Sequence, residues 1–594
     1  MKKLLTGNEA IARGAWEAGV KFAAAYPGTP STEILENLAQ YEEVVSEWAP
    51  NEKVAVESAA GASIAGIRTL CAMKHVGVNV AADPLFTFAY LGVNGGAVIV
   101  SADEPGMHSS QNEQDNRNYA RHAKVPMFEP SDSQESKDML KDAYAVSEEY
   151  DCPVLYRMTT RVCHSKSIVE CVDRVEVADK AYVKNIQKYC PLPAYAKIMQ
   201  VKLADNFKRL ETYTENSKWN YIEDNNKEIG VIGSGIAFRY AKEVFGDTAS
   251  YLKIGFSYPL PMKMIETFAG KVKKLYIFEE NDPIMENAIR AAGIECIGKD
   301  VLPSMGELTS DRIRQAIFGE NHQSLVTDSD KVVGRPPAFC AGCPHRGIFY
   351  ELGRRKDLMI FSDIGCYSLG LTPPYNATDA MICMGASISG GHGVAKAMKI
   401  KNEDTKVVSI IGDSTFFHSG MTSLMDVTYN KSNVLTIILD NRITGMTGHQ
   451  ENPGSGFDLK GNASPILDIE TIVKALGVKN VRTINPNNLK ETNDALEWGL
   501  SNDEASVIIT RWPCALKRFS EADKTEFPKA FKKHCKVNTD ICVGCKKCLK
   551  SGCPALAFNS IVPKKSGILE ESCLGCEICL QICPVHAIYV EGEE

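Results

Sequence analysis

The pattern of apolar positions is clearest in residues 407–447, where two short apolar runs flank a stretch with helical spacing. Val407–Ile411 and Val434–Leu439 are rich in β-branched residues, which is typical of buried strands. Between them, apolar side chains recur at helical spacing through Met421–Thr428. The pattern therefore predicts strand, helix and strand, which is one βαβ crossover of a parallel sheet.

Polar residues follow both predicted strands at their carboxyl ends, namely Gly412-Asp413-Ser414 and Asp440-Asn441. Because parallel sheets bind ligands at this edge, the Asp413 carboxylate and the Asn441 amide are expected to converge there. Both supply the hard oxygen ligands that suit Mg²⁺, and Gly412 lets a phosphate approach the backbone closely. The alternative interpretation is an ordinary turn with a capping aspartate.

The region before this motif divides into two predicted domains, residues 1–185 and 190–328. In the first, Asn8–Ala18 has helical spacing, and the apolar runs typical of buried strands are Phe22–Tyr26, Val78–Ala82 and Gly96–Val100. Asp103–Arg121 is polar and too long for a simple turn, which favours an active-site loop over a disordered segment.

The second predicted domain opens with a charged stretch, Lys202–Lys227, which indicates a linker or a surface helix. Ile229–Ile232 is a predicted strand followed by Gly233-Ser234-Gly235. Phe238 occupies the position where the dinucleotide fingerprint requires Gly or Ala, so NAD binding is rejected. Leu275–Phe278 continues the α/β pattern.

Ser329–Pro337 is predicted to be a boundary, after which residues 335–515 form the domain that carries the opening motif. Residues 516–534 are polar and lysine-rich and are predicted to be a linker, followed by a terminal domain at 535–594. The chain of 594 residues is long enough for about four domains. The predicted fold class is multidomain α/β with parallel sheets, plus a small C-terminal domain whose cysteine runs, described below, predict a two-cluster ferredoxin-like fold.

Composition narrows the function classes. With 44% hydrophobic and 24% charged residues, this is an ordinary soluble chain, and its net charge of −8 disfavours a nucleic-acid partner. The sequence predicts no membrane span and no signal peptide, because polar residues interrupt the apolar run of Met1–Leu5 at once. A cytoplasmic location is expected, where the 20 cysteines would not form disulfides.

Eight cysteines near the end of the chain form two similar runs, each closing on Cys-Pro. Four thiolates per run suit a [4Fe–4S] cubane, and in the two-cluster ferredoxin arrangement the fourth cysteine of each run serves the other cluster. One predicted cluster is held by Cys542, Cys545, Cys548 and Cys583, and the other by Cys573, Cys576, Cys579 and Cys553. A zinc site is the weaker alternative.

The opening motif resembles the thiamine diphosphate motif, with G-D-S and D-N in place of the commoner G-D-G and N-N. The resemblance implies that Asp413, Asn441 and the carbonyl of Ile443 hold Mg²⁺, with Gly412 and Ser414 beside the cofactor. The stretch YPGTPSTE at 26–33 resembles a motif of 2-oxoacid:ferredoxin oxidoreductases, which implies that Thr29 faces the substrate.

A glutamate that bonds the pyrimidine is also implied by this resemblance. Glu57 is the first candidate for that role and Glu52 the second; for either, the alternative is a solvated acid at a helix start. FCAGCPHRG at 339–347 resembles a family C-x-x-C motif, which places His345 beside the cofactor, although a surface or helix-capping histidine fits the sequence equally well. Cys340, Cys343, Cys366 and Cys514 are candidates for a third [4Fe–4S] cluster, or are simply reduced cysteines.

The domain order as a whole resembles the alpha subunits of indolepyruvate:ferredoxin oxidoreductases. The resemblance implies oxidation of an aryl pyruvate such as indolepyruvate with coenzyme A and ferredoxin, giving aryl-acetyl-CoA and CO₂. It also implies a smaller beta subunit and a hetero-oligomer with paired alpha chains. The alternatives are the same chemistry on pyruvate or a branched-chain 2-oxoacid, and a non-catalytic iron–sulfur electron-transfer scaffold.

Overall fold

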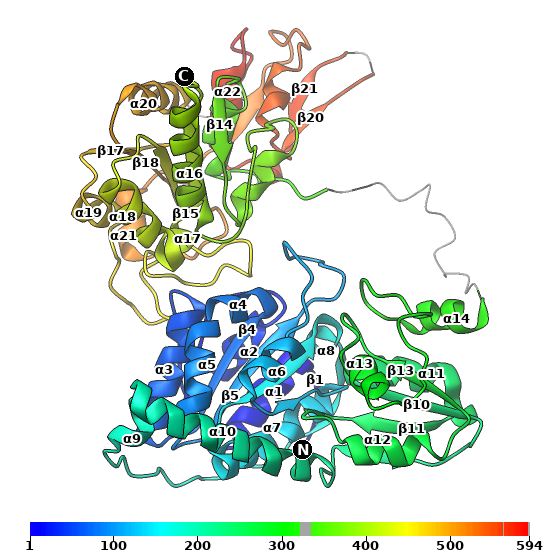
Figure 1. Cartoon of the computed structure of the whole chain (residues 1–594). Helices are drawn as coiled ribbons and strands as arrows, with labels where there is room; N and C mark the ends of the chain where they lie inside the picture. The colour runs from blue at the N-terminus through cyan, green and yellow to red at the C-terminus, as the bar shows by residue number, and fades with distance from the viewer. Residues whose placement is uncertain (321–333, 335, 562, 592–594) are drawn as a thin grey trace. The chain divides into compact units, whose positions relative to one another are not determined.

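The computed structural model describes residues 1–320, 334, 336–561 and 563–591 (Figure 1). The chain divides into two compact units, Met1–Ser329 and Asp330–Glu594. This division falls inside the predicted boundary Ser329–Pro337, most of which lies outside the described residues. Within the described part of the chain, no helix is long and apolar enough to cross a membrane.

The first unit is built on a seven-stranded sheet in the order β12-β6-β7-β5-β4-β2-β3. All neighbours pair in parallel except β12 with β6. The strands are β2 (Phe22–Ala25), β3 (Val45–Trp48), β4 (Thr69–Lys74), β5 (Ala97–Asp103), β6 (Met127–Phe128), β7 (Val154–Thr159) and β12 (Phe256–Tyr258). Side chains of β4, β5 and β7 are almost all buried, as expected of a parallel sheet that is covered on both faces.

Helices cover this sheet: α1 (Gly7–Glu17), α2 (Thr32–Leu38), α3 (Glu52–Ala65), α4 (His75–Val80), α5 (Ala82–Leu91), α6 (Arg117–Ala123) and α7 (Ser133–Tyr150). The prediction of a strand at Val78–Ala82 is wrong, because this run forms the end of α4 and the start of α5. A short apolar run looks the same in a buried helix as in a buried strand. A small antiparallel pair, β1 (Lys2–Thr6) and β8 (Lys166–Glu170), completes this part.

A second sheet in the same unit has the order β13-β10-β11-β9. Its strands are β9 (Asn220–Glu223), β10 (Ile229–Ser234), β11 (Ser250–Ile254) and β13 (Lys274–Phe278), with helices α11 (Gly235–Phe245), α12 (Met262–Ala269), α13 (Ile284–Ala291) and α14 (Ser310–Phe318). The charged stretch before it is largely a surface helix, α10 (Pro193–Thr214). Because β12 follows β11 but joins the first sheet, the two predicted N-terminal domains are interlocked.

The second unit contains an all-parallel sheet in the order β14-β15-β16-β18-β17. The strands are β14 (Leu358–Phe361), β15 (Lys406–Gly412), β16 (Leu435–Asp440), β17 (Asn480–Ile484) and β18 (Ser506–Arg511). Its helices are α15 (His345–Leu352), α16 (Ala386–Lys401), α18 (Met421–Tyr429), α19 (Ile469–Ala475) and α20 (Leu489–Ser501). The predicted strand–helix–strand unit at 407–440 is present as β15, α18 and β16.

The terminal segment is a small cysteine-lined fold in this second unit. It has two antiparallel pairs, β19 (Cys535–Val537) with β22 (Ile588–Val590) and β20 (Leu556–Phe558) with β21 (Ser566–Ile568), and one short helix, α22 (Ile578–Ile582). Its cysteine side chains form the centre of its own apolar cluster. The fold class predicted from the sequence, parallel α/β domains followed by a ferredoxin-like segment, is confirmed.

Residues 516–534 are packed and are not the linker predicted from their polar composition. They contain α21 (Glu521–Glu526), and Lys517 forms a 2.6 Å ion pair with Asp523 in which neither side chain is exposed. Asp523 also accepts hydrogen bonds from Ser520, 2.9 Å from both its backbone nitrogen and its hydroxyl. The polar residues that suggested a solvated linker are therefore partly internal ion pairs.

Candidate functional site

Three strand ends of the second unit carry buried polar side chains at the same edge of the sheet. Asp363 follows β14, Asp413 follows β15 and Asn441 follows β16. Asp363 accepts hydrogen bonds from the backbone nitrogens of Gly385 (2.9 Å) and Ser387 (3.0 Å), so it caps the start of α16. Gly385 has φ +85°, a conformation that glycine adopts without strain.

Asp413 is almost completely buried, with 2% of its surface exposed. Its carboxylate accepts a hydrogen bond of 2.8 Å from the Ser414 backbone nitrogen and a weak one of 3.4 Å from the Asn452 amide. Burial, and the nearby Asp440 carboxylate, raise the pKa of Asp413 to about 8. Among the described residues, no Lys, Arg or His forms an ion pair with Asp413, whereas Asp440 pairs with Arg511 at 2.9 Å.

Asn441 and His345 lie side by side in this site. The Asn441 Nδ2 is 3.3 Å from His345 Nε2, and the Asn441 Oδ1 accepts a bond of 3.2 Å from the Ile443 backbone nitrogen. Burial lowers the pKa of His345 to about 4, so its imidazole is neutral and can accept the amide proton. His345 therefore lies next to the motif and is not a surface residue.

This donor set fits a divalent cation. A buried carboxylate without a cationic partner is costly, and a metal ion would supply the missing charge. Asp413, Asn441 and Ile443 offer a carboxylate, an amide and a carbonyl oxygen, which is the ligand chemistry of Mg²⁺. Among the described residues, no group of three or more His, Cys, Asp or Glu side chains is placed to hold one metal ion. The candidate site therefore has a single carboxylate, with an amide oxygen and a carbonyl oxygen as its other ligands. Gly412 and Ser414 are both buried beside Asp413.

The four cysteines proposed for a third cluster gather near the same site. The Cys514 backbone nitrogen donates to the carbonyl of Asn441 at 3.0 Å, and Cys343 N donates to the carbonyl of Cys340 at 3.1 Å. Burial, followed by the neighbouring Cys514 and Cys340 thiols, raises the pKa of Cys366 to about 12. Cys366 thus interacts electrostatically with Cys340 and Cys514, and Cys343 interacts with Cys366 and Cys514. The sequence separation of Cys340 and Cys514 does not reveal this proximity.

The terminal cysteines are arranged around a cavity in the crossed pattern. Cys553 of the first run lines the same cavity as Cys573, Cys576 and Cys579 of the second run. In the other group, the Cys548 thiol interacts electrostatically with Cys583 and Cys545. Backbone nitrogens donate to two of the sulfurs, Cys535 N to Cys573 Sγ and Ala587 N to Cys583 Sγ, both at 3.3 Å. Such N–H···S bonds are among the features that set cluster potentials.

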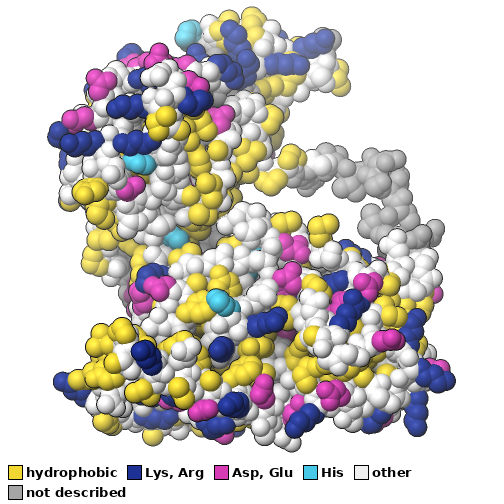
Figure 2. Space-filling model, viewed as in Figure 1, with side chains coloured by type: hydrophobic (Ala, Val, Ile, Leu, Met, Phe, Trp, Pro, Cys, Tyr) yellow, Lys and Arg dark blue, Asp and Glu magenta, His cyan; other side chains and the backbone are white. Residues whose placement is uncertain are grey.

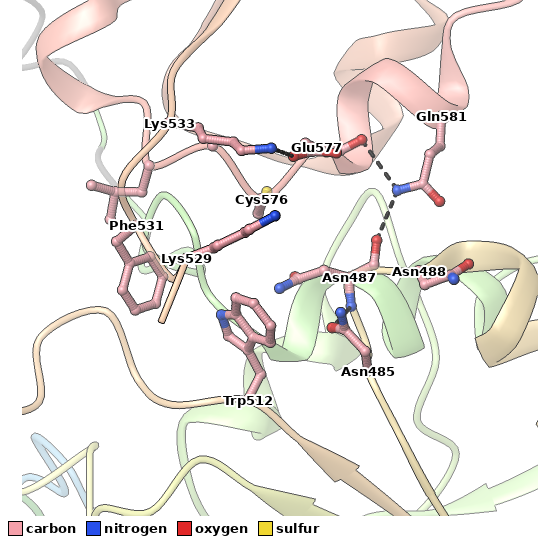
Figure 3. A pocket seen from close by; sticks show the side chains of 12 residues that line it. Asn485, Asn487, Asn488, Trp512, Lys529, Phe531, Lys533, Cys576, Glu577 and Gln581 are labelled. Atoms are coloured by element: carbon pink, nitrogen blue, oxygen red, sulfur yellow. Dashed lines mark hydrogen bonds and ion pairs between the residues drawn. The ribbon is translucent and has the colours of Figure 1, made fainter. Parts of the chain in front are cut away.

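A second cavity, of about 420 Å³, lies beside the first, with Cys576 in both walls (Figure 3). Lys529, Lys533 and Trp512 project toward it, and Gln581 bridges the tail to the carbonyl of Asn487 at 2.7 Å. Lys533 pairs with Glu577 at 3.5 Å. The cavity therefore gives the cysteine-lined region a basic outer wall.

The first unit gathers a second group of residues at the carboxyl edge of its large sheet. Thr29 lies half-buried in the loop after β2, and Glu52 is 4% exposed at the start of α3. Burial lowers the pKa of Lys74, at the end of β4, against the opposing effect of Glu104 and Glu52. A side chain at Gly77 would come within 2.6 Å of the Glu52 carboxylate, so this glycine leaves it room.

Glu57, the first candidate for the pyrimidine contact, lies elsewhere on α3. Its side chain is 47% exposed and forms an ion pair with Lys53 on the same helix. Such an exposed pair along a helix is a common surface feature. Glu52, the second candidate, is the buried one of the two.

The polar loop at Asp103–Arg121 is held in place by buried ion pairs. Arg117 contacts Asp115 (2.6 Å) and Glu279 (2.7 Å), and Arg157 contacts Asp103 at 2.6 Å. The ion pair of Arg117 with Glu279 attaches the loop to the end of β13, and the role of the loop in an active site stays a prediction.

Sequence reasoning missed several polar residues at these edges, namely the half-buried Lys74 and the buried Glu104, Asp363 and Asn452. Asp363 had a usable signal, since it follows a strand as Asp413 does. Lys74 and Glu104 had none, because burial of a charged side chain depends on which elements pack over it.

Three family profiles match the chain. Residues 13–226 match "Pyruvate flavodoxin/ferredoxin oxidoreductase, thiamine diP-bdg", residues 363–510 match "Thiamine pyrophosphate enzyme, C-terminal TPP binding domain", and residues 567–589 match "4Fe-4S binding domain". The first match extends beyond the predicted boundary at residue 185 and includes α10. The chain therefore has thiamine diphosphate-binding domains and a [4Fe–4S]-binding segment.

Three relatives that match along almost their whole length are described as indolepyruvate oxidoreductase subunit IorA. The Archaeoglobus fulgidus protein is 39% identical over 99% of this chain and 97% of its own length, and the Methanothermobacter thermautotrophicus protein is 40% identical over 100% and 98%. The Pyrococcus horikoshii protein is 37% identical over 99% and 96%. Because the match extends over almost the whole of each protein, the chain belongs to the indolepyruvate oxidoreductase subunit IorA family.

Proposed function

We propose that this chain is the alpha subunit of an enzyme that oxidatively decarboxylates indolepyruvate, or another aryl pyruvate, to aryl-acetyl-CoA and CO₂, with ferredoxin as the electron acceptor. The observation that carries this proposal is the placement of the cysteine-lined tail directly against the loop that also presents His345 to the thiamine motif. A decarboxylase without redox chemistry does not need a cysteine-lined segment beside its cofactor motif. A ferredoxin-dependent oxidoreductase needs one, because electrons must travel from the cofactor to ferredoxin.

Bound thiamine diphosphate supplies the carbanion chemistry that cleaves the carboxylate from a 2-oxoacid. Asp413, Asn441 and the Ile443 carbonyl are the proposed Mg²⁺ ligands, with Gly412 and Ser414 against the diphosphate. His345, being neutral, holds the Asn441 amide and would orient the amide oxygen for a bound Mg²⁺. Asp363 orders the α16 terminus next to them.

For the proton step on the aminopyrimidine, burial favours Glu52 over Glu57. A carboxylate screened from water can hold or release a proton at a ring nitrogen, whereas a half-exposed acid paired to Lys53 has weaker control. Thr29 lies at the same sheet edge and is the proposed substrate contact.

Clusters held by the cysteines of the tail would carry electrons to ferredoxin. The proposed sets are Cys542, Cys545, Cys548 and Cys583 for one [4Fe–4S] cluster and Cys553, Cys573, Cys576 and Cys579 for the other. Cys340, Cys343, Cys366 and Cys514 are proposed for a third. Lysines gather over the C-terminal segment (Figure 2), which suits docking of an acidic carrier such as ferredoxin.

The partners proposed are a beta subunit, coenzyme A and ferredoxin, in a cytoplasmic hetero-oligomer with paired alpha chains.

The test is anaerobic purification with the beta subunit, followed by analysis of thiamine, Mg²⁺ and iron. A panel of 2-oxoacids is then assayed with coenzyme A and a dye acceptor. Highest kcat/KM for indolepyruvate or phenylpyruvate supports the proposal. Preference for pyruvate or a branched-chain 2-oxoacid assigns the other substrate class. Absence of bound thiamine diphosphate favours a non-catalytic scaffold.

A further inference from the structure

The Arg346 side chain is completely buried between the C-x-x-C loop and the cysteine-lined tail. Its guanidinium makes four hydrogen bonds. Nη1 donates to the Tyr375 hydroxyl (2.8 Å) and the Ser551 carbonyl (2.7 Å), and Nη2 donates to the carbonyls of Phe339 (3.0 Å) and Cys340 (2.6 Å). The arginine thus attaches the segment at 339–340 to the tail at Ser551.

One of the five N–H donors of this guanidinium has no hydrogen-bond acceptor. The Arg346 Nε is buried and has no hydrogen-bond partner among the described residues. Arg346 also lines the cavity whose walls carry Cys553, Cys573, Cys576 and Cys579. A buried N–H without an acceptor is costly, so a sulfur acceptor in this cavity would complete the site.

The charge of Arg346 is likewise unbalanced. Its four partners are carbonyls and a hydroxyl, and within the described part of the chain it forms no ion pair with Asp or Glu. Buried arginines are normally paired with an acid. A cubane held by four thiolates carries net negative charge and would provide the missing counter-charge.

We propose that Arg346 donates an N–H···S hydrogen bond from Nε to the [4Fe–4S] cluster of Cys553, Cys573, Cys576 and Cys579 and raises its reduction potential. This inference rests on the proposed assignment of these four cysteines to one cluster. A nearby positive charge and a hydrogen bond to sulfur both stabilise the reduced cluster, which carries one more electron. No bond or proton is transferred in the step.

The consequence is a ranking of the two tail clusters. The same guanidinium holds the Cys340 carbonyl, so the cluster that it tunes would be the tail cluster on the side of the C-x-x-C loop. A higher potential would make this cluster the more readily reduced of the two. Arg346 is therefore a positioning and tuning residue and does not touch the substrate.

The first test uses the wild-type holoprotein with its beta subunit, labelled with ¹⁵N-arginine and reduced by dithionite. Pulsed EPR should detect ¹⁵N hyperfine coupling to one of the tail clusters. Two tail clusters without any such coupling would overturn the inference and leave the proposed function intact. Fewer than two tail clusters would contradict the cluster assignment itself and the inference with it.

The second test is an EPR-monitored redox titration of variants. Arg346→Met should shift one tail cluster to a more negative potential and leave the other unchanged, and Arg346→Lys should shift it less because the charge remains. Lys529→Met is the matched control, since it removes a positive charge from the exposed wall on the other side of Cys576 (Figure 3) and should have little effect. Unchanged potentials in both arginine variants would refute the inference; if those variants lose the cluster, the labelling test decides.

Discussion

Glu52 and Glu57 differ in how deeply their side chains are buried, although both lie on helix α3. Glu52 is 4% exposed and faces Gly77, whereas the Glu57 side chain is 47% exposed and pairs with Lys53. Five residues of separation place the two glutamates on different faces of the helix. Their positions in the sequence did not distinguish them, since both precede the same run of small residues.

Substitution of these two glutamates tests which one acts in the reaction. Glu52→Gln is expected to retain thiamine diphosphate and lose turnover by about 10²-fold or more, because the amide keeps the size but cannot exchange the proton. Glu57→Gln, the matched control on the same helix, should remain close to wild type. Both are measured as kcat with a dye acceptor in the reconstituted complex. The opposite ranking would return the role to Glu57.

The acid Glu280 gives a pH-dependent prediction. Burial raises its pKa from 4.5 to about 7, against the opposing charge of Arg157. Because the folded-state pKa is the higher one, this group's contribution to stability is complete below pH 4.5 and is lost as pH rises through about 7. Glu280→Gln should therefore be more stable than wild type at pH 8 by up to about 3 kcal/mol, with little difference at pH 4.5.

Unfolding of the full-length protein at the two pH values measures this difference. Glu228→Gln, at an exposed position of the same unit, serves as the control and should be neutral at both. A Glu280→Gln variant that is destabilised equally at both pH values would show that its hydrogen bond from Leu308 N matters more than its charge.

At the scale of elements, helix α21 and the residues before it hold the loop of the thiamine motif in place through ion pairs. Arg442, which has φ +58° within that motif, contacts Asp523 at 3.1 Å, and Asp523 is also the partner of Lys517. The ion pairs are buried on both sides of Asp523. The motif loop is thus fixed from outside the βαβ unit that supplies its ligands.

Removing the Asp523 carboxylate should leave the buried Lys517 ammonium without a partner. Asp523→Ala is expected to lower the unfolding free energy of the second unit by about 3 kcal/mol, the usual cost of breaking a buried pair from one side. Denaturant unfolding monitored by tryptophan fluorescence measures it, since Trp512 packs on Phe527 at 5.4 Å. Glu521→Ala, on the exposed side of the same helix, is the control. Equal, small effects from both substitutions would mean that this segment behaves as a linker after all.

The cysteines at 340, 343, 366 and 514 give an element-scale prediction about iron. If they hold a third cluster, the anaerobic protein should contain about twelve iron atoms per chain, and about eight if only the tail clusters form. We expect the higher value, because the structure gathers these four thiols beside Asn441. Replacing Cys366 and Cys514 together by serine should then remove about four iron atoms, while replacing the exposed Cys190 should remove none.

Much of the fold could be predicted from local pattern, because buried parallel strands are continuous apolar runs. Strands β10, β15 and β16 lie within a residue or two of their predicted positions. The error at residues 78–82 arose where an apolar run is short and Gly77 leaves the type of element open. The proximity of Asp413 and Asn441 was predictable because strand ends converge by topology, and their role as metal ligands stays a prediction. The positions of Lys74 and Glu104 depend on packing between distant segments.

At the scale of the whole molecule, the terminal segment is attached to the rest of the second unit more firmly than its separate composition indicates. Arg346 bonds the Ser551 carbonyl, Gln581 bonds the backbone of Asn487 and Leu489, and Ile578 packs with Leu489. These contacts join the tail to the parallel-sheet part of the same unit. The tail also has a cysteine-centred core of its own.

Deleting residues 535–594 tests how far the two functions separate. The side-chain hydrogen bonds of Asp413 and Asn441 go to His345, Ser414, Ile443 and Asn452, all of which remain. The shortened chain should thus still bind thiamine diphosphate, with a lower melting temperature because Arg346 loses its Ser551 partner. With the beta subunit present it should fail to reduce ferredoxin. Thiochrome fluorescence measures the cofactor and visible absorbance follows ferredoxin. Ferredoxin reduction at the wild-type rate would mean that electrons leave by a route that bypasses the tail, and loss of thiamine diphosphate would mean that the tail supports the site through packing.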